Sequence, residues 1–313
     1  MTQHVNPSIE LAKRGARLAA LGLVHDLRVI RDRLDDPGDR EALHDFRVAL
    51  RRLRSWLRAF RPVLRDTLRP KNERRLKRLA AETAASRDLE VHIRWVRRER
   101  RTLRGPSRAG ATWLLRRLER DKISRDGKLR RALDDKFTRG TERVEAALLH
   151  FQTSVHHDGP SYATVAGELV TRHTSALVEA MKKLSKSSDR LEVHTARIAA
   201  KRLRYLLEVL EPHGFPSTGA IEALKQVQTD LGEIHDAQVF GSEIATLIDG
   251  LLAERALARA KANGAAVGAR TALGDPIPGL RMLARRLRHH ERAAFKRVER
   301  SWDGDAARQL APA

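Results

Sequence analysis

Apolar residues recur at helical spacing along nearly the whole chain, and no segment shows the sustained alternation that is typical of β-strands. Pro and Gly cluster between the periodic stretches, where they interrupt helices. The pattern predicts helices near residues 8–35, 40–66, 70–102, 107–150, 160–186, 190–211, 217–251, 252–272 and 277–302. Aromatic residues make up only 4% of the chain, which also disfavours strands. We expect an all-α fold.

One stretch of the chain occurs twice. Residues 44–62 read HDFRVALRRLRSWLRAFRP and residues 194–212 read HTARIAAKRLRYLLEVLEP, so that the two copies align at a constant offset of 150. Downstream, LKRLAAETAASRDLEV at 76–91 aligns with LKQVQTDLGEIHDAQV at 224–239. The repeat predicts an internal duplication, with two helical bundles of about four long helices each, related by a pseudo-two-fold axis. Matching residues of the two halves would then face one another.

The break HHDGPS at 156–161 lies between the two copies. It separates an expected repeat half 8–156 from an expected repeat half 160–302. We expect residues 303–313 to form a disordered tail.

The first copy places a row of cations on one face of its helix, opposite the apolar face. This row consists of His44, Arg47, Arg51, Arg54 and Arg58. The second copy rebuilds it with His194, Arg197, Lys201 and Arg204, and has Glu208 where the first has Arg58. Like charges one turn apart destabilise a helix. Because no acid occurs between Arg47 and Arg65, we expect a bound anion to compensate the first row, and the spacing suits the phosphates of an extended polyphosphate or nucleic-acid strand.

An ordinary solvated charged face is the alternative explanation for a single such row. Two copies in one register, each including the histidine, argue against it. In the downstream pair, Lys77 matches Lys225 and Asp88 matches Asp236. The aspartates are expected either to orient an arginine of the neighbouring row or to contact a ligand.

The overall charge agrees with an anionic partner. The chain has 62 Lys and Arg against 40 Asp and Glu, a formal net charge of +22. Such a charge predicts attraction to nucleic acid, anionic membranes or polyphosphate, although an arginine-rich genome would produce a similar bulk composition. The chain has no cysteine, which excludes disulfides and cysteine zinc sites. No apolar run is long enough for a signal peptide or a membrane span, so we expect a cytoplasmic protein that does not associate with membranes.

Catalytic and metal-binding signatures are absent from the sequence. A metal-binding His44 or His194 would need His, Asp or Glu one turn away on the same face, and both rows have Arg or Lys there. Four His-Asp dipeptides lack the helical companions of a metal-dependent phosphohydrolase. We therefore expect no catalytic residue, no metal and no cofactor.

The motif H-x-x-R-x-x-x-[RK]-R-L-R-x-x-L in both halves resembles the CHAD family (conserved histidine α-helical domain), as does Leu-Lys followed by [RH]-D-x-x-V. The resemblance covers a single domain at 8–302 and implies two similar helical bundles around a basic cleft or pore. It also implies binding of inorganic polyphosphate and association with polyphosphate granules. The binding set that it implies is His44, Arg47, Arg51, Arg52, Arg54, Lys77, His194, Arg197, Lys201, Arg202, Arg204 and Lys225.

Arg58 joins this set because it extends the first row. The first copy departs from the family pattern at Ala84, which stands where the second copy has Gly232. Our functional hypothesis is non-enzymatic binding of inorganic polyphosphate. Two alternatives stay open at this point: a nucleic-acid-binding protein, which the charge favours, and a histidine-metal phosphohydrolase.

Overall fold

The computed structural model describes residues 11–36, 38–39, 41–133, 137–150, 159–184, 189–215, 217–261 and 274–302. The described residues are almost entirely helical and contain no β-strand. The helices are α1 (Ala12–Arg33), α2 (Ala42–Ala59), α3 (Arg61–Leu64), α4 (Pro70–Arg100), α5 (Gly105–Ala132), α6 (Thr138–Leu149), α7 (Tyr162–Lys183), α8 (Arg190–Leu210), the 3-10 helix η3 (Glu211–His213), α9 (Thr218–Lys261) and α10 (Ile277–Ser301). The all-α prediction is confirmed.

Two predicted helices are interrupted, and two others are joined. The helix predicted at 40–66 breaks at Phe60, because Pro62 near the start of α3 has no backbone N–H to continue the hydrogen bonding of α2. The helix predicted at 107–150 is divided into α5 and α6. In contrast, α9 runs without a break from Thr218 to Lys261, since Gly250 is surrounded by strong helix formers such as Leu, Ala, Glu and Arg.

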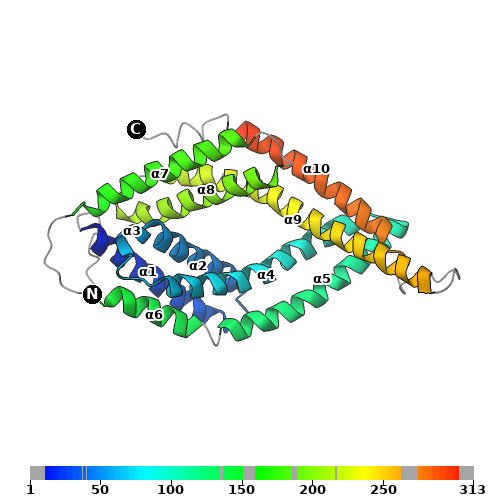
Figure 1. Ribbon diagram of the computed structural model, residues 1–313, viewed down its shortest axis with the longest axis horizontal. Helices are drawn as coiled ribbons and strands as arrows, with labels where there is room; N and C mark the ends of the chain where they lie inside the picture. Colours follow the sequence, from blue (N-terminus) through cyan, green and yellow to red (C-terminus); the bar gives the residue numbers. More distant parts are fainter. Residues whose placement is uncertain are drawn as a thin grey trace.

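The helices form two arms that meet at both ends of an elongated molecule (Figure 1). One arm contains α1, α2, α4, α5 and α6, and the other contains α7, α8, α9 and α10. At one end α1 packs on α7 and α2 on α8, and at the other end α5 packs on α10. The α5–α10 contact depends on two glycines, because a Cβ at Gly279 would lie only 2.6 Å from Cα of Gly110.

Buried apolar residues of the described chain form three clusters rather than two separate bundle cores. The first surrounds Trp56 and includes Leu210 of the second half. The second joins α7 to α10 within the second half. The third brings Leu114 of α5 against Leu280 of α10, and so belongs to both halves. The first and third clusters each contain residues of both halves, so the two halves share parts of their core. The expectation of two bundles related by a pseudo-two-fold axis stays a prediction.

The duplication itself stays a prediction. The proposed half-boundary at 156 and the proposed tail at 303–313 lie outside the described residues.

The amphipathic pattern of α2 and α8 determines how these helices are oriented. Phe46, Leu50 and Leu53 of α2 are fully buried, and the indole N–H of Trp56 donates to the carbonyl of Ala16 at 3.0 Å, which holds α2 against α1. In α8, the matching apolar face is buried in the second cluster. Burial of these faces turns the opposite, cationic faces of both helices towards the space between the arms.

No described helix has an 18-residue window that is apolar enough to cross a membrane.

Candidate anion-binding cleft

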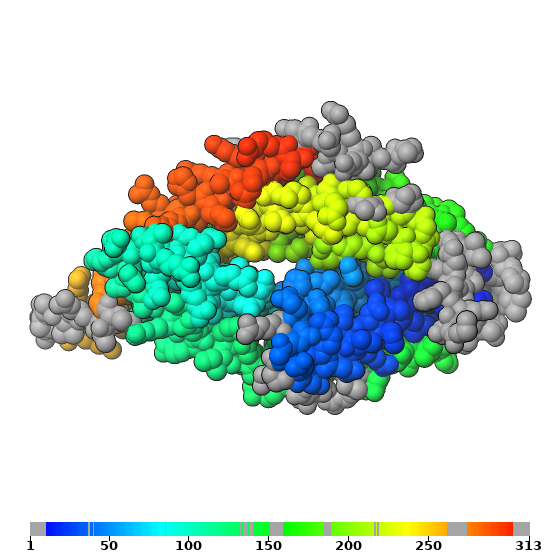
Figure 2. Space-filling model, turned by 180° about the vertical axis from the view of Figure 1, so that it is seen from behind, coloured from blue at the N-terminus to red at the C-terminus, as the bar shows by residue number. Residues whose placement is uncertain are grey.

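A cavity of about 420 Å³, which we call the central cleft, lies between α2 and α4 of one arm and α8 and α9 of the other. Figure 2 shows a slit between the blue and cyan surface of α2 and α4 and the yellow-green surface of α8 and α9. The lining residues are Arg47, Arg51, Arg54, Ser55, Arg58, Ala84, Asp88, Val91, His92, Arg197, Ile198, Lys201, Arg202, Tyr205, His235, Asp236 and Val239.

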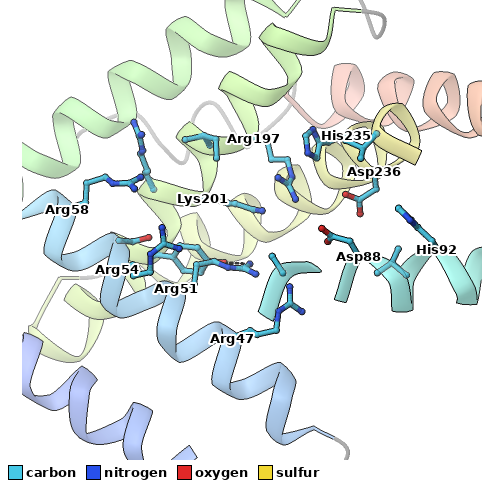
Figure 3. A pocket seen from close by; sticks show the side chains of 17 residues that line it. Arg47, Arg51, Arg54, Arg58, Asp88, His92, Arg197, Lys201, His235 and Asp236 are labelled. Atoms are coloured by element: carbon cyan, nitrogen blue, oxygen red, sulfur yellow. Dashed lines mark hydrogen bonds between the residues drawn. The ribbon is translucent and has the colours of Figure 1, made fainter. Parts of the chain in front are cut away.

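Most of the central cleft is basic, because both repeated segments turn their cations towards it. The α2 segment contributes Arg47, Arg51, Arg54 and Arg58, and the α8 segment contributes Arg197, Lys201 and Arg202. The two rows face the same space from opposite helices (Figure 3). The structure therefore brings seven of the residues predicted from the sequence into one cavity.

Crowding and burial disfavour the charged forms of these side chains. The pKa of Arg47 is lowered to about 10, first by burial and then by the charges of Arg51 and Arg87. Burial, followed by the charges of Arg197 and Arg51, lowers the pKa of Lys201 to about 7. The Lys201 amine is thus only partly protonated at neutral pH. An anion between the two rows would relieve the repulsion and stabilise the protonated amine.

Two carboxyl groups lie at the other end of the central cleft. Asp88 of α4 and Asp236 of α9 point towards one another (Figure 3). Burial raises the pKa of both, while Arg47 lowers the pKa of Asp88 and Arg197 that of Asp236. Within the described residues, no hydrogen bond joins either carboxyl group to an arginine. These acids therefore offset the positive charge at one end only.

Two histidines lie beside the acids. The ring of His92 is buried and stacks on Phe240, with 3.9 Å between ring centroids, and burial lowers the His92 pKa to about 4. The pKa of His235 also falls to about 4, through burial and then the charge of Arg197. The exposed ring of His194, a predicted ligand, lies 5.4 Å from the ring of His235. Both His92 and His235 are neutral at neutral pH.

Two predicted ligands, Arg52 and Arg204, pair with Glu208 of α8 instead of lining the central cleft. The Glu208 side chain is only 7% exposed, and its carboxylate accepts hydrogen bonds from Arg52 of α2 at 2.8 Å and from Arg204 of α8 at 2.9 Å. Arg51 adds a second contact between α2 and α8 by donating to the Tyr205 hydroxyl at 2.8 Å. The acid at the position of Arg58 therefore joins α2 to α8.

The other predicted residues lie outside the central cleft and are exposed: His44, Lys77, His194 and Lys225. Lys225 forms an ion pair with Glu222 on the same helix. Their role as ligands stays a prediction. The described residues include no group of three or more His, Asp and Glu side chains that could hold a metal ion.

Several lining residues were not recognised as candidates from the sequence. Ser55 and Tyr205 occupy the same register in the two copies, and both line the central cleft, as do Val91 and Val239 of the downstream pair. The matching positions in the two copies could have identified these residues. They were not candidates because a serine, a tyrosine and two valines carry no charge that would indicate anion binding.

Comparison with known proteins agrees with this architecture. The model of the CHAD domain matches residues 23–245. The crystal structure of the CHAD domain from the plant Ricinus communis is similar, with a TM-score of 0.70 and 22% identity over 96% of this chain and 95% of that chain. PptA from Streptomyces chartreusis has a TM-score of 0.66 and 14% identity, over 94% of this chain and 100% of that one. No curated protein sequence matches significantly. The family match spans more than half of the residues, and the chain belongs to the CHAD family.

Proposed function

We propose that this protein binds inorganic polyphosphate in the central cleft without hydrolysing it, and that it associates with polyphosphate granules. One observation carries the proposal: seven cations from two facing helices line one cavity, while only two acids oppose them at one end. Guanidinium groups bind phosphate oxygens through paired, charge-assisted hydrogen bonds. A flexible string of phosphates can contact both rows at once. The resemblance of the repeated motif to the CHAD family implies the same ligand.

The shape of the central cleft favours polyphosphate over nucleic acid. A cavity of about 420 Å³ between four helices cannot enclose a duplex. Proteins that bind single strands stack the bases on exposed aromatic rings. Tyr205 is the one tyrosine, tryptophan or phenylalanine among the lining residues, and it is 1% exposed and hydrogen-bonded to Arg51. Polyphosphate has no bases and needs no such platform.

Titration with long-chain polyphosphate at two salt concentrations tests the binding. If six or more phosphates are bound, raising the salt from about 50 to about 200 mM should weaken the affinity about a thousandfold or more, by analogy with counterion release from nucleic acid. An affinity that barely depends on salt contradicts binding through many phosphates. Displacement of polyphosphate by an equal phosphate concentration of duplex DNA would favour the nucleic-acid alternative.

Incubation of the same samples with Mg²⁺ or Mn²⁺ tests the absence of turnover. We expect no orthophosphate release above the protein-free control. Release that is abolished by His44→Ala or His194→Ala would support a metal-dependent phosphohydrolase instead.

A further inference from the structure

A second cavity, of about 610 Å³, adjoins the central cleft. It lies where the end of α2 meets α3, the start of α4 and α7. Ser55, Arg58 and Arg202 line both cavities, so the two share a common boundary. Outside the repeated segments, its lining comes from Arg65, Leu68 and Pro70 and from Leu169, Arg172 and His173 of α7.

The shared boundary is positively charged without compensation. Burial and then the charge of Arg58 lower the pKa of Arg202, which indicates that the two guanidinium groups lie near each other. Neither makes an ion pair or hydrogen bond with any residue that the structure describes. Two cations from different helices, held together without an acid, favour an anion between them.

Further cations continue this boundary into the second cavity. Arg172 of α7 is exposed and has no ion-pair partner among the described residues. The neighbouring His173 is half-buried, and its pKa is lowered by burial first and then by Arg202 and Arg172. Arg172 of α7 therefore lines the second cavity together with Arg202 of α8, while His173 is mainly neutral at neutral pH.

The floor of the second cavity is apolar. Leu169 and Leu68 are 5% and 6% exposed and line the cavity together with the cations. An apolar floor excludes water from one side of a bound group and so strengthens the attraction between a guanidinium and a phosphate. It offers no hydrogen-bond acceptor that would compete with a phosphate for Arg172.

We propose that the second cavity is a further phosphate-binding site, through which a long polyphosphate chain continues after it leaves the central cleft between Arg58 and Arg202. The site takes phosphate groups of the same chain, with Arg172 as its main ligand. This inference rests on the proposed function. Because a short chain fills the central cleft alone, the second cavity makes the protein prefer long chains.

The test compares Arg172→Ala with the unmodified protein, using tripolyphosphate and long-chain polyphosphate as separate ligands. Long-chain affinity should fall about five- to tenfold, because one charge-assisted contact is lost. Tripolyphosphate affinity should change by less than about twofold, because salt screens the effect of a charge that lies far from the bound ligand. For the long chain only, the slope of log affinity against log salt should decrease by about one.

Two variants serve as controls. Arg143→Ala removes one exposed charge on α6, which lines neither cavity, and should leave both affinities near those of the unmodified protein. Arg172→Lys keeps the charge and should recover part of the long-chain affinity. The inference is overturned if Arg172→Ala weakens both ligands equally, or if it behaves as Arg143→Ala does. If the unmodified protein binds neither ligand, the proposed function itself is wrong, which is a different result.

Discussion

The two copies of the repeated motif, in α2 and α8, use equivalent arginines for opposite purposes. In α2, Arg54 lines the central cleft and Arg52 pairs with Glu208. In α8 the roles are exchanged, since Arg202 lines the central cleft and Arg204 pairs with Glu208. A motif position therefore does not by itself determine whether an arginine faces the central cleft or pairs with an acid.

One residue causes this difference. The first copy has Arg58, which stays exposed and lines the central cleft, where the second has Glu208, which is buried between the helices. A buried carboxylate needs charged partners, and it takes one arginine from each helix. The cations that remain in the central cleft form no ion pair with an acid among the described residues and stay available to an anion.

The largest expected effect comes from removing the acid that joins the helices. Glu208→Ala leaves Arg52 and Arg204 without their partner and should lower the free energy of unfolding by about 2–3 kcal/mol. The expected loss is smaller than that for breaking a fully buried ion pair, because the Arg52 side chain is 43% exposed. Urea unfolding measures the loss. Glu222→Ala removes an exposed acid of α9 and should change stability by less than about 0.5 kcal/mol. Equal effects of the two variants would show that Glu208 does not join the arms.

A pair of substitutions at one motif position sharpens the comparison. Arg54→Ala should weaken long-chain polyphosphate binding about tenfold and leave stability nearly unchanged, because the side chain lines the central cleft. Arg204→Ala should lower stability and change affinity by less than about threefold, because its guanidinium is bound to Glu208. Urea unfolding and a binding titration on both proteins measure the contrast. The reverse pattern would mean that the division of roles is wrong.

A smaller and reversible effect should appear with pH. Burial and the charges of Arg197 and Arg51 lower the pKa of Lys201 to about 7, and a bound polyanion stabilises the ammonium and raises that pKa again. Binding then takes up a proton, so affinity is highest below the lowered pKa and falls as pH rises through it. Between about pH 6 and about pH 8, long-chain affinity should decrease up to about tenfold. Lys201→Arg, which stays charged, should flatten this profile; an unchanged profile would assign the dependence to another group.

The smallest effect is expected at the exposed predicted ligands. Lys225 is paired with Glu222, and it lies outside both cavities. Lys225→Ala should therefore change long-chain affinity by less than about twofold. Affinity measured at low salt, where the screening of surface charges is weakest, is the most sensitive test of a contribution from Lys225. A tenfold loss would place the bound chain along the outer surface of α9.

The periodicity of the sequence was sufficient to predict the helical fold and the two faces of α2 and α8. Phe46 and Leu50 are buried, and Arg47 and Arg51 face the central cleft, as their spacing predicts. The break at Phe60 was harder to place, because Pro62 can either begin a helix or end one.

Contacts between distant segments could not be read from spacing. Glu208 was recognised as a departure from the repeat, but its pairing with Arg52 depends on how closely α2 approaches α8. His92 belongs to no recognisable motif, and it lines the central cleft because α4 forms one of its walls. Such residues become candidates once the register of the two copies is used to place α4 opposite α9.

Arg51 and Lys201 occupy the same register in the two copies. The most direct test of a shared site is therefore to compare Arg51→Ala with Lys201→Ala. Each should weaken long-chain polyphosphate binding about tenfold or more, since each removes a contact to the same chain. Calorimetry of the unmodified protein should give one bound chain per protein. If Lys201→Ala binds as tightly as the unmodified protein while Arg51→Ala does not bind, the first copy acts alone, and the account of one cleft built from two copies is contradicted.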